Sequence, residues 1–361
     1  MRVYGSKISY YTGKLESYLR YKEVGYESLP LAPHGKAIKL NTGTLQMPAV
    51  ERDDGRWMSD STPIIAQLEK EYPEAPVIPS DPVVRFIALL MEDYADEWLW
   101  RPAMHYRWSY RDSRELAASV LAAEQTKDIP LPGWLKRQFF KSRQRIGFVV
   151  RDGVCDATWD HVEAGYFAAL DNMTCMLKRR RFLLGDAPSV ADFGLMAPMF
   201  RHFSQDPTPL ALMLNRAPDV FAWVSRMWNA KATTLPPEFV DVIPTDAAPM
   251  LKEISETHLH QLAANAEAYK SGMRQFSMRV QGFEYVKLPV SRYRVACLEA
   301  LREGYSALAE EQKSSVQALL PHPEAGILWD PDFCVRSGYD EEKLAPFNKA
   351  INVYGTGVPR S

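Results

Sequence analysis

The sequence lacks any apolar run close to the roughly 20 residues that a membrane-spanning helix needs, so no membrane span is expected. Its first six residues, MRVYGS, are short of the apolar core of a signal peptide, and a cytoplasmic location is predicted. Only four cysteines occur, far apart and without a CxxC pair. We therefore expect reduced thiols, no disulfide framework and no metal site of the zinc type.

Neither sign of charge predominates in the chain. Its 43 basic and 45 acidic residues give a net charge of −2. Such a chain lacks the basic field of a dedicated nucleic-acid-binding protein, so no nucleic-acid partner is expected. The apolar fraction of 46% and the charged fraction of 24% are those of a folded globular protein, and 361 residues suggest more than one domain.

The first 80 residues alternate between strand-like and helix-like patterns. Arg2–Tyr4 predicts a strand, and Leu15, Tyr18 and Leu19 share one face of a helix that Gly25 can close. A second strand, a hairpin around an Asp-Asp-Gly turn at 53–55, and another helix follow. This order predicts a small sheet with mixed strand directions.

Two proline-rich breaks divide the rest of the chain. Prolines 73, 76, 79 and 82 mark a linker, after which the pattern is helical to about residue 230. Within this stretch, Ser189 and Asp192 have the spacing of a capping box at the start of a helix. Leu235–Pro237 opens a mostly helical region that runs to Ser361, with strand predicted around Phe276–Val286.

Three local patterns occur in a fixed order along the first 230 residues. The first is Ser9–Leu15 (SYYTGKL), at a predicted strand-to-helix turn. The second consists of Gln46–Val50 (QMPAV) and Asp60–Ile64 (DSTPI), and the third is Phe182–Phe193 (FLLGDAPSVADF). Together they resemble the motifs of the cytosolic glutathione S-transferases of serine or cysteine type.

The resemblance implies the fold class and the division of the chain. It implies an α/β thioredoxin-like N-terminal domain over residues 1–80 and an all-α glutathione-transferase C-terminal domain over residues 83–234. A mostly helical extension over residues 235–361 lies outside the resemblance. Three roles for it stay open: covering the active site, extending the dimer interface or enlarging the helical core. A homodimer is also implied by the family.

The resemblance implies that Ser9 is catalytic and that glutathione is the co-substrate. The Ser9 hydroxyl would donate a hydrogen bond to the glutathione sulfur, and the N-terminus of the following helix would add a positive dipole end. Both would favour the thiolate, which attacks a small hydrophobic electrophile. Ser9 is also placed to act only as a helix N-cap. Tyr10 and Tyr11 are alternative hydroxyl donors, which we rank below Ser9.

The glutathione-binding residues implied by the resemblance are Gln46, Met47, Pro48, Asp60 and Ser61. A cis bond before Pro48, as in the thioredoxin-like superfamily, would let the Met47 backbone pair with the cysteinyl part of glutathione. The alternative is a trans proline at the start of an edge strand. Asp60 and Ser61 would hold the γ-glutamyl group, whose carboxylate suits a helix start.

A pocket for the second substrate is expected against the first long helix after the linker, where aromatic residues gather. Its candidate residues are Tyr10, Tyr11, Tyr94, Trp98 and His105. Aromatic side chains suit flat, apolar electrophiles. At helical spacing, however, such a stripe more often belongs to the core, and the core is the preferred interpretation of this one.

The sequence also departs from the family pattern. Tyr10 stands where many members have proline, Asp60 replaces a glutamate, and the absence of cysteine at positions 9 and 12 disfavours thiol exchange. With the long extension, these departures support an alternative: a non-catalytic glutathione-transferase-like interaction protein, to which the metaxin-like and failed-axon-like similarity of Tyr11–Tyr21 also points. A C-terminal segment lying in the cleft over Ser9 would favour it.

One basic and aromatic segment stands apart from these motifs. Trp134–Lys141 continues to Arg143 and Arg145. Contact with an anionic membrane or RNA is one hypothesis for it. A solvated helix face with buried aromatics is the preferred one.

Overall fold

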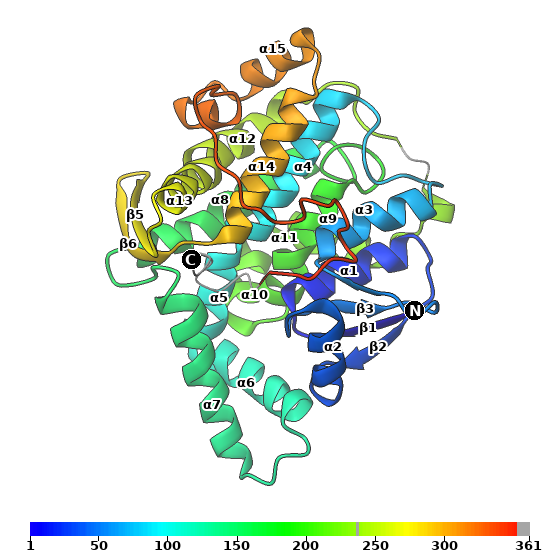
Figure 1. Ribbon diagram of the computed structural model, residues 1–361, viewed down its shortest axis with the longest axis vertical. Helices are drawn as coiled ribbons and strands as arrows, with labels where there is room; N and C mark the ends of the chain where they lie inside the picture. Colours follow the sequence, from blue (N-terminus) through cyan, green and yellow to red (C-terminus); the bar gives the residue numbers. More distant parts are fainter. Residues whose placement is uncertain (236–237, 352–361) are drawn as a thin grey trace.

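The computed structural model describes residues 1–235 and 238–351. Figure 1 shows a small sheet and its helices on one side, a helical body beside it, and C-terminal helices at the opposite end. The predicted break at residues 235–237 includes Pro236 and Pro237, which lie outside the described residues, as do positions 352–361 of the predicted extension.

The N-terminal region has the predicted elements in the predicted order, with one further helix, α2, between the second strand and the hairpin. They are β1 (Arg2–Gly5), α1 (Tyr10–Tyr21), β2 (Glu27–Pro30), α2 (Gly35–Thr42), β3 (Ala49–Glu51), β4 (Trp57–Ser59) and α3 (Ser61–Glu71). The sheet order is β2-β1-β3-β4, with β1 parallel to β2 and antiparallel to β3. This mixed sheet confirms the thioredoxin-like fold class, and the hairpin between β3 and β4 forms at the predicted turn.

Successive residues of β1 point to opposite faces of the sheet and enter separate clusters. Val3 faces the main core with α1 and α3, and Tyr4 packs with Ile38 of α2 on the other face. The end of α1 differs from the prediction. The helix stops at Tyr21, and Glu23 takes the left-handed conformation (φ 55°) that was expected near Gly25. The Val24 N–H bonds the Leu19 carbonyl at 2.9 Å, which closes the turn before Gly25 is reached.

The next region is helical throughout, as predicted. Its helices are α4 (Pro82–Glu97), α5 (Trp100–Ser109), α6 (Arg111–Gln125), α7 (Gly133–Arg145), α8 (Trp159–Leu177), α9 (Val190–Pro198), α10 (Pro207–Arg216) and α11 (Pro218–Asn229). The capping box at the start of α9 is confirmed: the Ser189 N–H donates to Asp192 Oδ2 at 2.9 Å. Because α9 packs against both α1 and α4, this cap supports the junction of the first two regions.

The C-terminal region adds helices and one hairpin. Its elements are α12 (Ala248–Glu253), α13 (His260–Lys270), β5 (Gln275–Val280), β6 (Phe283–Pro289), α14 (Arg292–Ser306) and α15 (Glu310–Leu319), with a π-helical stretch at Ile254–Leu259 between α12 and α13. Both α14 and α15 pack on α4, and one cluster of buried apolar residues extends from Val3 to Leu328. The extension therefore enlarges the core. The domain boundaries near residues 80 and 235 remain predictions.

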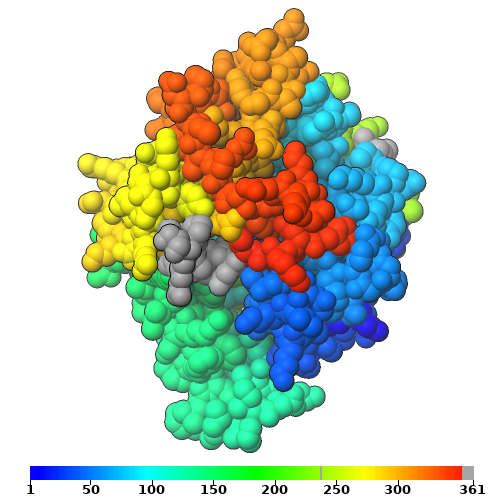
Figure 2. All heavy atoms as spheres, in the orientation of Figure 1, coloured from blue at the N-terminus to red at the C-terminus, as the bar shows by residue number. Residues whose placement is uncertain are grey.

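The chain then returns to the sheet-containing region. In Figures 1 and 2 residues 331–351 cross the front of the molecule and lie on the N-terminal region. Within the described residues, no helix is both long and apolar enough to cross a membrane.

Candidate active site

Ser9 lies where the turn after β1 leads into α1. Its backbone is extended (φ −78°, ψ 132°), and its Oγ accepts a long hydrogen bond of 3.4 Å from the Thr12 N–H. Gly5 makes the tight turn possible, since a Cβ there would lie 2.4 Å from Thr12 Oγ1. Ser9 is thus an N-cap, and it also lines a large cavity. The capping and ligand-facing positions coexist in one residue.

This cavity beside Ser9, hereafter the cavity, has a volume of about 460 Å³. It lies between the N-terminal region and the helical region, and its aromatic walls come from Tyr11, Trp100, Trp108 and Phe148. The volume falls in the range of ligand pockets, and such walls suit a flat apolar molecule.

The charged side chains that line the cavity are all arginines. Arg107 is buried and donates to Asp206 Oδ2 at 2.8 Å and to the Ile8 carbonyl at 2.6 Å. Arg143 and Arg151 are exposed, and neither forms a hydrogen bond or ion pair with a side chain in the described part of the protein. The cavity therefore presents two cations that a ligand could engage.

Tyr10 and Tyr11 both line the cavity, but their hydroxyls are used elsewhere. The Tyr10 hydroxyl donates to the Ala95 carbonyl at 2.5 Å, and the Tyr11 hydroxyl donates to the Asp96 carbonyl at 2.9 Å. The Tyr11 ring stacks on Trp100, with ring centroids 5.6 Å apart. Because both hydroxyl hydrogens point at α4, Ser9 remains the better candidate for a donor to a bound sulfur.

The five predicted glutathione-binding residues lie together around a second, smaller space, hereafter the slot. Gln46, Met47, Pro48, Asp60 and Ser61 all line it. The Met47–Pro48 bond is cis, as predicted. Met47 and Gln46 border the cavity as well, so the two spaces are neighbours.

Asp60 stands at the start of α3 with a left-handed backbone (φ 73°), which a non-glycine residue adopts only under tertiary constraint. Burial raises the pKa of Asp60 to about 6, although a hydrogen bond from the Tyr293 hydroxyl (2.6 Å) opposes the shift. Burial and the nearby Asp60 raise the pKa of Tyr293 well above its usual range, so it stays a donor. A helix of the C-terminal region thus reaches the predicted γ-glutamyl position.

A C-terminal segment roofs the slot. This roof, Tyr339–Ile351, contributes Tyr339, Ala350 and Ile351 to the lining. It is held by backbone bonds from the Ser59 N–H to the Pro346 carbonyl (3.1 Å) and from the Ala350 N–H to the Thr42 carbonyl (2.9 Å). The space left is about 50 Å³, room for a few water molecules.

Two acceptor oxygens in the slot have no hydrogen-bond partner among the described residues. They are Gln46 Oε1 and Asp96 Oδ1, both buried. A buried acceptor without a donor is costly, so such pairs commonly mark the place of a ligand group or a water. Their position fits an ammonium or N–H group.

Buried ion pairs stand behind the slot. Lys14 Nζ of α1 donates to Glu92 and Asp96 of α4 and, at 2.9 Å, to Thr62 Oγ1 of α3. Burial alone would lower the pKa of Lys14, but the charges of Asp96 and Glu92 outweigh it and raise that pKa. This cluster joins three helices behind one wall of the slot.

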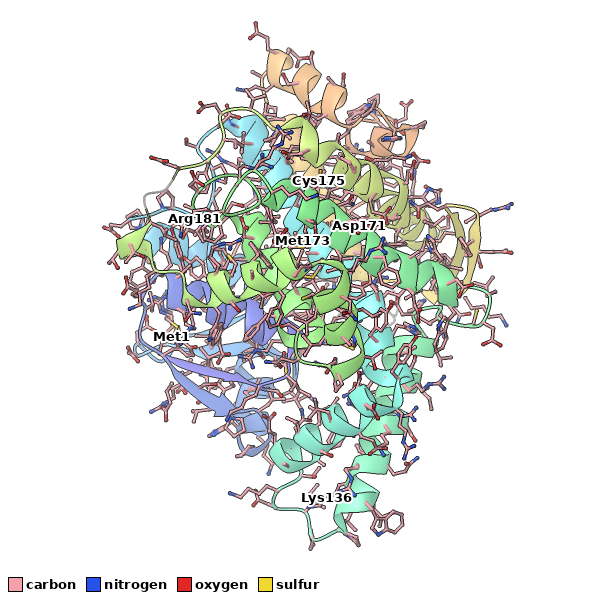
Figure 3. The ribbon with its side chains drawn as sticks, turned by 180° about the vertical axis from the view of Figure 1, so that it is seen from behind. Met1, Lys136, Asp171, Met173, Cys175 and Arg181 are labelled. Atoms are coloured by element: carbon pink, nitrogen blue, oxygen red, sulfur yellow. The ribbon has the colours of Figure 1, made fainter. Side chains whose placement is uncertain are left out.

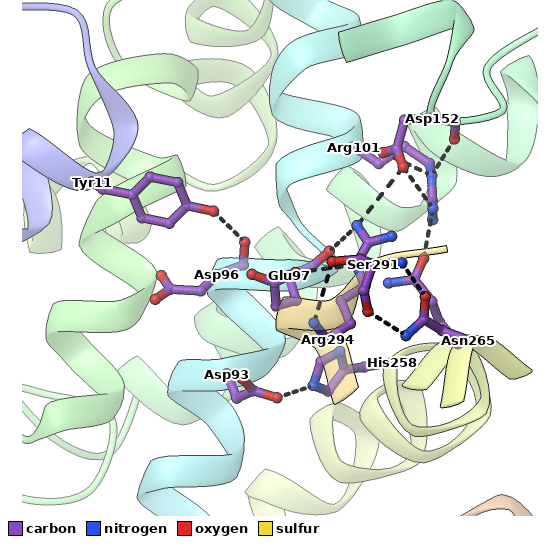
Figure 4. A network of polar contacts seen from close by, with 11 residues as sticks. Tyr11, Asp93, Asp96, Glu97, Arg101, Asp152, His258, Asn265, Ser291 and Arg294 are labelled. Atoms are coloured by element: carbon purple, nitrogen blue, oxygen red, sulfur yellow. Dashed lines mark hydrogen bonds and ion pairs between the residues drawn. The ribbon is translucent and has the colours of Figure 1, made fainter. Parts of the chain in front are cut away.

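Figure 4 shows how the end of α4 is tied to the C-terminal region. Arg294 Nε lies 3.1 Å from Glu97 Oε2, and His258 Nε2 lies 2.6 Å from Asp93 Oδ2. Arg101 at the start of α5 continues the network through Asp152, with 3.2 Å between Nε and Oδ2. Consecutive turns of α4 are therefore fixed by charges from the extension.

The structure does not bring Tyr94, Trp98 and His105 to either space. All three are buried in the core, and none lines the cavity or the slot. Trp98 packs edge-on against His161 of α8 and Tyr285 of β6, away from Ser9. The His105 ring lies 3.1 Å from Glu163 Oε1, and burial lowers its pKa. The preferred core interpretation of the aromatic stripe is thereby supported.

Several lining residues escaped the sequence motifs. Trp100 and Trp108 follow closely after Tyr94 and Trp98 in the sequence, but they line the cavity. α4 ends at Glu97 and a separate helix, α5, begins at Trp100, so the helical spacing of α4 does not continue into α5. Tyr293 and the roof come from outside the motif region and had no local signal. No group of three or more metal-binding side chains is assembled within residues 1–235 and 238–351.

The N-terminal part of the chain is similar to one family of known proteins. Residues 3–76 match the family described as glutathione S-transferase, N-terminal domain. Solved structures that are similar include a glutathione S-transferase from Rhodospirillum rubrum F11, with 15% identity, 69% of this chain and 91% of that chain covered, and a TM-score of 0.42. The β-etherase LigF from Sphingobium sp. strain SYK-6 has 20% identity, 64% and 96% coverage, and a TM-score of 0.46.

A third similar structure is a glutathione S-transferase from Methylobacterium radiotolerans JCM 2831 in complex with glutathione sulfonate. Its identity is 17%, with 66% of this chain and 96% of that chain covered and a TM-score of 0.39. The family match spans β1 to α3, the part that carries Ser9, Met47, Pro48 and Asp60. Residues 3–76 are therefore similar to the N-terminal domain of glutathione S-transferases, and they form the thioredoxin-like part of a chain that continues with a helical region and a C-terminal region with one hairpin.

Proposed function

We propose that this protein is a glutathione S-transferase that uses Ser9 to stabilise the glutathione thiolate. One observation carries the proposal. Ser9, at the turn where β1 leads into α1, and Met47, before β3, line the same aromatic cavity. A cysteinyl group paired with the Met47 backbone would have its sulfur close to the Ser9 hydroxyl and the N-terminus of α1. A hydrogen bond and a positive dipole end at that point favour the anion.

The proposed reaction runs between this sulfur and a molecule in the cavity. The glutathione thiol loses its proton to solvent, and Ser9 donates a hydrogen bond to the resulting thiolate without itself attacking. The thiolate forms a C–S bond with an electrophilic carbon held against Trp100 and Phe148. A leaving anion would depart with the electron pair of the broken bond, toward Arg143 and Arg151, which are unpaired in the described structure. A small hydrophobic electrophile, aromatic and able to release an anion, suits these walls.

The slot supports binding of the γ-glutamyl group. Gln46 Oε1 and Asp96 Oδ1 are acceptors without donors in the described structure, and Asp60 adds a third oxygen-bearing group for the ammonium. Ser61 at the start of α3 suits the carboxylate. Because only about 50 Å³ is free, glutathione would enter after the roof moves away.

A second candidate function rests on that roof. Tyr293 already engages Asp60, and the roof lines the space that we propose for the γ-glutamyl group. These contacts support a non-catalytic transferase-like protein that binds an aromatic ligand in the cavity without glutathione. In the described structure the roof does not line the cavity beside Ser9, which is why we place the transferase first.

The experiment measures glutathione binding by calorimetry and conjugation of an aryl halide for the wild type, Ser9→Gly and Ser9→Thr. Glycine keeps most of the helix capping and removes the hydroxyl, whereas threonine keeps the hydroxyl. We expect conjugation by Ser9→Gly to fall about 100-fold, the effect of losing one donor to a developing anion, and by Ser9→Thr to fall much less.

Equal activity of Ser9→Gly and the wild type would remove the role of Ser9. A wild type that binds aromatic ligands but neither binds nor conjugates glutathione would favour the second candidate. A cytoplasmic homodimer remains the predicted form, and light scattering of the purified chain checks the dimer.

A further inference from the structure

The hairpin of α6 and α7 projects from the body of the molecule. In Figures 1 and 3 it extends away from the other helices at one end of the long axis, and Lys136 lies near that end. α7 packs against α6 and α5, and the helix continues as a π-helical stretch at Ile146–Val150. The hairpin therefore has a large surface that no other part of the described chain covers.

That surface is apolar to an unusual degree. Trp134 is 63% exposed, Phe139 58% and Ile146 65%, while Phe140 is 3% exposed. The preferred expectation of buried aromatics in this segment is therefore wrong for Trp134 and Phe139, because only the opposite face of α7 meets α5 and α6. Large exposed apolar patches on a protein surface commonly mark an interaction site. The hairpin tip is defined here by its exposed apolar residues: Ile129, Leu131, Trp134, Leu135 and Phe139.

The apolar residues continue along one side of the helix. Leu135, Phe139, Ile146 and Val150 recur at intervals of four, seven and four residues, which places them on one stripe of a helix. The stripe faces solvent, whereas the buried side of α7 carries Phe140 and Gln144. Core formation within the described chain does not explain it.

The hairpin is also strongly basic. Between Arg111 and Arg151 the sequence has nine basic and four acidic residues, a net charge of +5 in a chain whose net charge is −2. Helix α7 has five of these cations and no acidic residue. Arg137, Arg143 and Arg145 form no hydrogen bond or ion pair with a side chain in residues 1–235 and 238–351.

We propose that the hairpin tip docks on an anionic lipid surface. Tryptophan, phenylalanine and leucine flanked by lysine and arginine are the composition that binds the interface of a bilayer. The tip is a projecting end, which can enter the headgroup layer, and its cations would meet anionic lipid headgroups. A second copy meeting this tip across a two-fold axis would instead bring two hairpins of charge +5 together.

Docking would also bring the cavity to the lipid. Arg143 of α7, Phe148 of the π-helical stretch that continues it, and Arg151 at the end of that stretch all line the cavity. Apolar molecules dissolved in the bilayer would then lie close to it. This consequence does not depend on glutathione, so the docking proposal stands or falls separately from the transferase.

The test is co-sedimentation of the full-length protein with vesicles of phosphatidylcholine alone and of phosphatidylcholine with 30% phosphatidylserine. We expect at least tenfold stronger partition to the anionic vesicles at 0.1 M salt, and a marked loss at 0.5 M salt as the charges are screened. Trp134→Ser/Phe139→Ser should lose at least tenfold of this binding. Both side chains are largely exposed, so the fold should be retained.

Two control variants test whether binding depends on the tip itself or on any exposed apolar or basic side chain. Val242→Ser/Met273→Ser changes two apolar residues that are equally exposed elsewhere, and it should bind like the wild type. Arg137→Gln/Arg145→Gln should weaken binding to the anionic vesicles, whereas Lys252→Gln/Arg336→Gln, on other surfaces, should not. Equal partition of the wild type to both vesicles would overturn the proposal. Unchanged vesicle binding by Trp134→Ser/Phe139→Ser would also overturn it. The same holds if the protein does not bind vesicles and the tip variant instead loses dimerisation or binding to an acidic protein.

Discussion

The cavity beside Ser9 and the slot beside Asp60 are neighbours in one predicted site, yet they are built differently. The cavity holds about 460 Å³, and its described lining contains no carboxylate. The slot holds about 50 Å³, is lined by Asp60, Asp96 and Glu97, and is closed by a segment nearly 300 residues further along the chain. Among the described residues, the roof lines the half that would anchor glutathione and not the half that would carry the chemistry.

The difference follows from which parts of the chain meet at each place. The walls of the cavity come from the N-terminal and helical regions, the two parts that the family resemblance covers. The slot also receives Tyr293 and the roof from the extension. The meeting of three regions buries charged side chains around the slot, and each of them needs an oppositely charged partner because it is removed from water. The extension therefore contributes side chains to the slot and none to the described lining of the cavity beside Ser9.

The largest effect is expected from removing the buried cation behind the slot. Lys14→Met leaves Glu92 and Asp96 without the ammonium that bridges them, and breaking one partner of a buried pair costs about 3–5 kcal/mol. We expect the free energy of unfolding to fall by this amount in a denaturant titration.

The control for Lys14→Met lies on the cavity side. Arg143→Met removes a cation that is exposed and unpaired in the described structure, so its cost should be within about 0.5 kcal/mol. Equal unfolding midpoints for the two variants would contradict the view that the buried ion pairs behind the slot stabilise the fold whereas the exposed arginines of the cavity do not.

An intermediate effect is expected from loosening the roof. Lys349 Nζ donates to the carbonyls of Leu40 and Asn41, each at 2.7 Å, and Arg56 lies over the Phe347 ring at 4.6 Å. Phe347→Ala/Lys349→Ala removes both anchors, worth about 2 kcal/mol together. If the roof competes with glutathione, calorimetry should show glutathione affinity rising about 30-fold.

Leu344→Ala is the matched control for the roof variant. It changes an apolar residue of the same segment that is half exposed. It should leave glutathione affinity unchanged, and both variants should bind an aromatic cavity ligand like the wild type. Glutathione affinity that is identical in the roof variant and the wild type would show that the roof is not the barrier.

The elements that sequence predicted well depend on local contacts. The Asp-Gly hairpin, the Ser189–Asp192 capping box and the mixed strand directions of the sheet all arise from residues close in the chain or from a known motif. The cis bond before Pro48 followed from the family resemblance, since most prolines are trans.

What sequence missed depends on distant contacts or on helix phase. Tyr293 and Asp60 are 233 positions apart, and no pattern near either residue indicates their hydrogen bond. Trp98 and Trp100 are nearly adjacent, but the break after α4 sends the first to the core and the second to the cavity. Trp134 and Phe139 read as core residues, but the structure supplies no partner surface for that side of α7 in its described part.

The smallest effect concerns the charge of Asp60 and would distinguish the slot from the cavity by pH. The pKa of Asp60 is raised to about 6 in the fold, above its value in an unfolded chain, because burial disfavours the carboxylate. The folded protein therefore retains this proton between about pH 4 and pH 6, and the contribution of Asp60 to stability falls as the pH rises through that window. The affinity for an ammonium group depends on pH in the opposite direction. It rises with pH because the ammonium binds the ionised carboxylate of Asp60. From pH 5 to pH 7 the ionised fraction of Asp60 rises about tenfold, and glutathione affinity measured by calorimetry should rise by about the same factor.

A control variant is needed because Asp206 beside Arg107 also has a pKa raised to about 6 by burial, so the pH dependence of the wild type alone does not identify the group. Asp60→Asn keeps an acceptor for Tyr293 and removes the titration of Asp60. Burial also raises the pKa of Asp96 and of Glu97 in the slot, so if the affinity of Asp60→Asn still rises tenfold, the pH dependence belongs to one of these other buried carboxyls and not to Asp60.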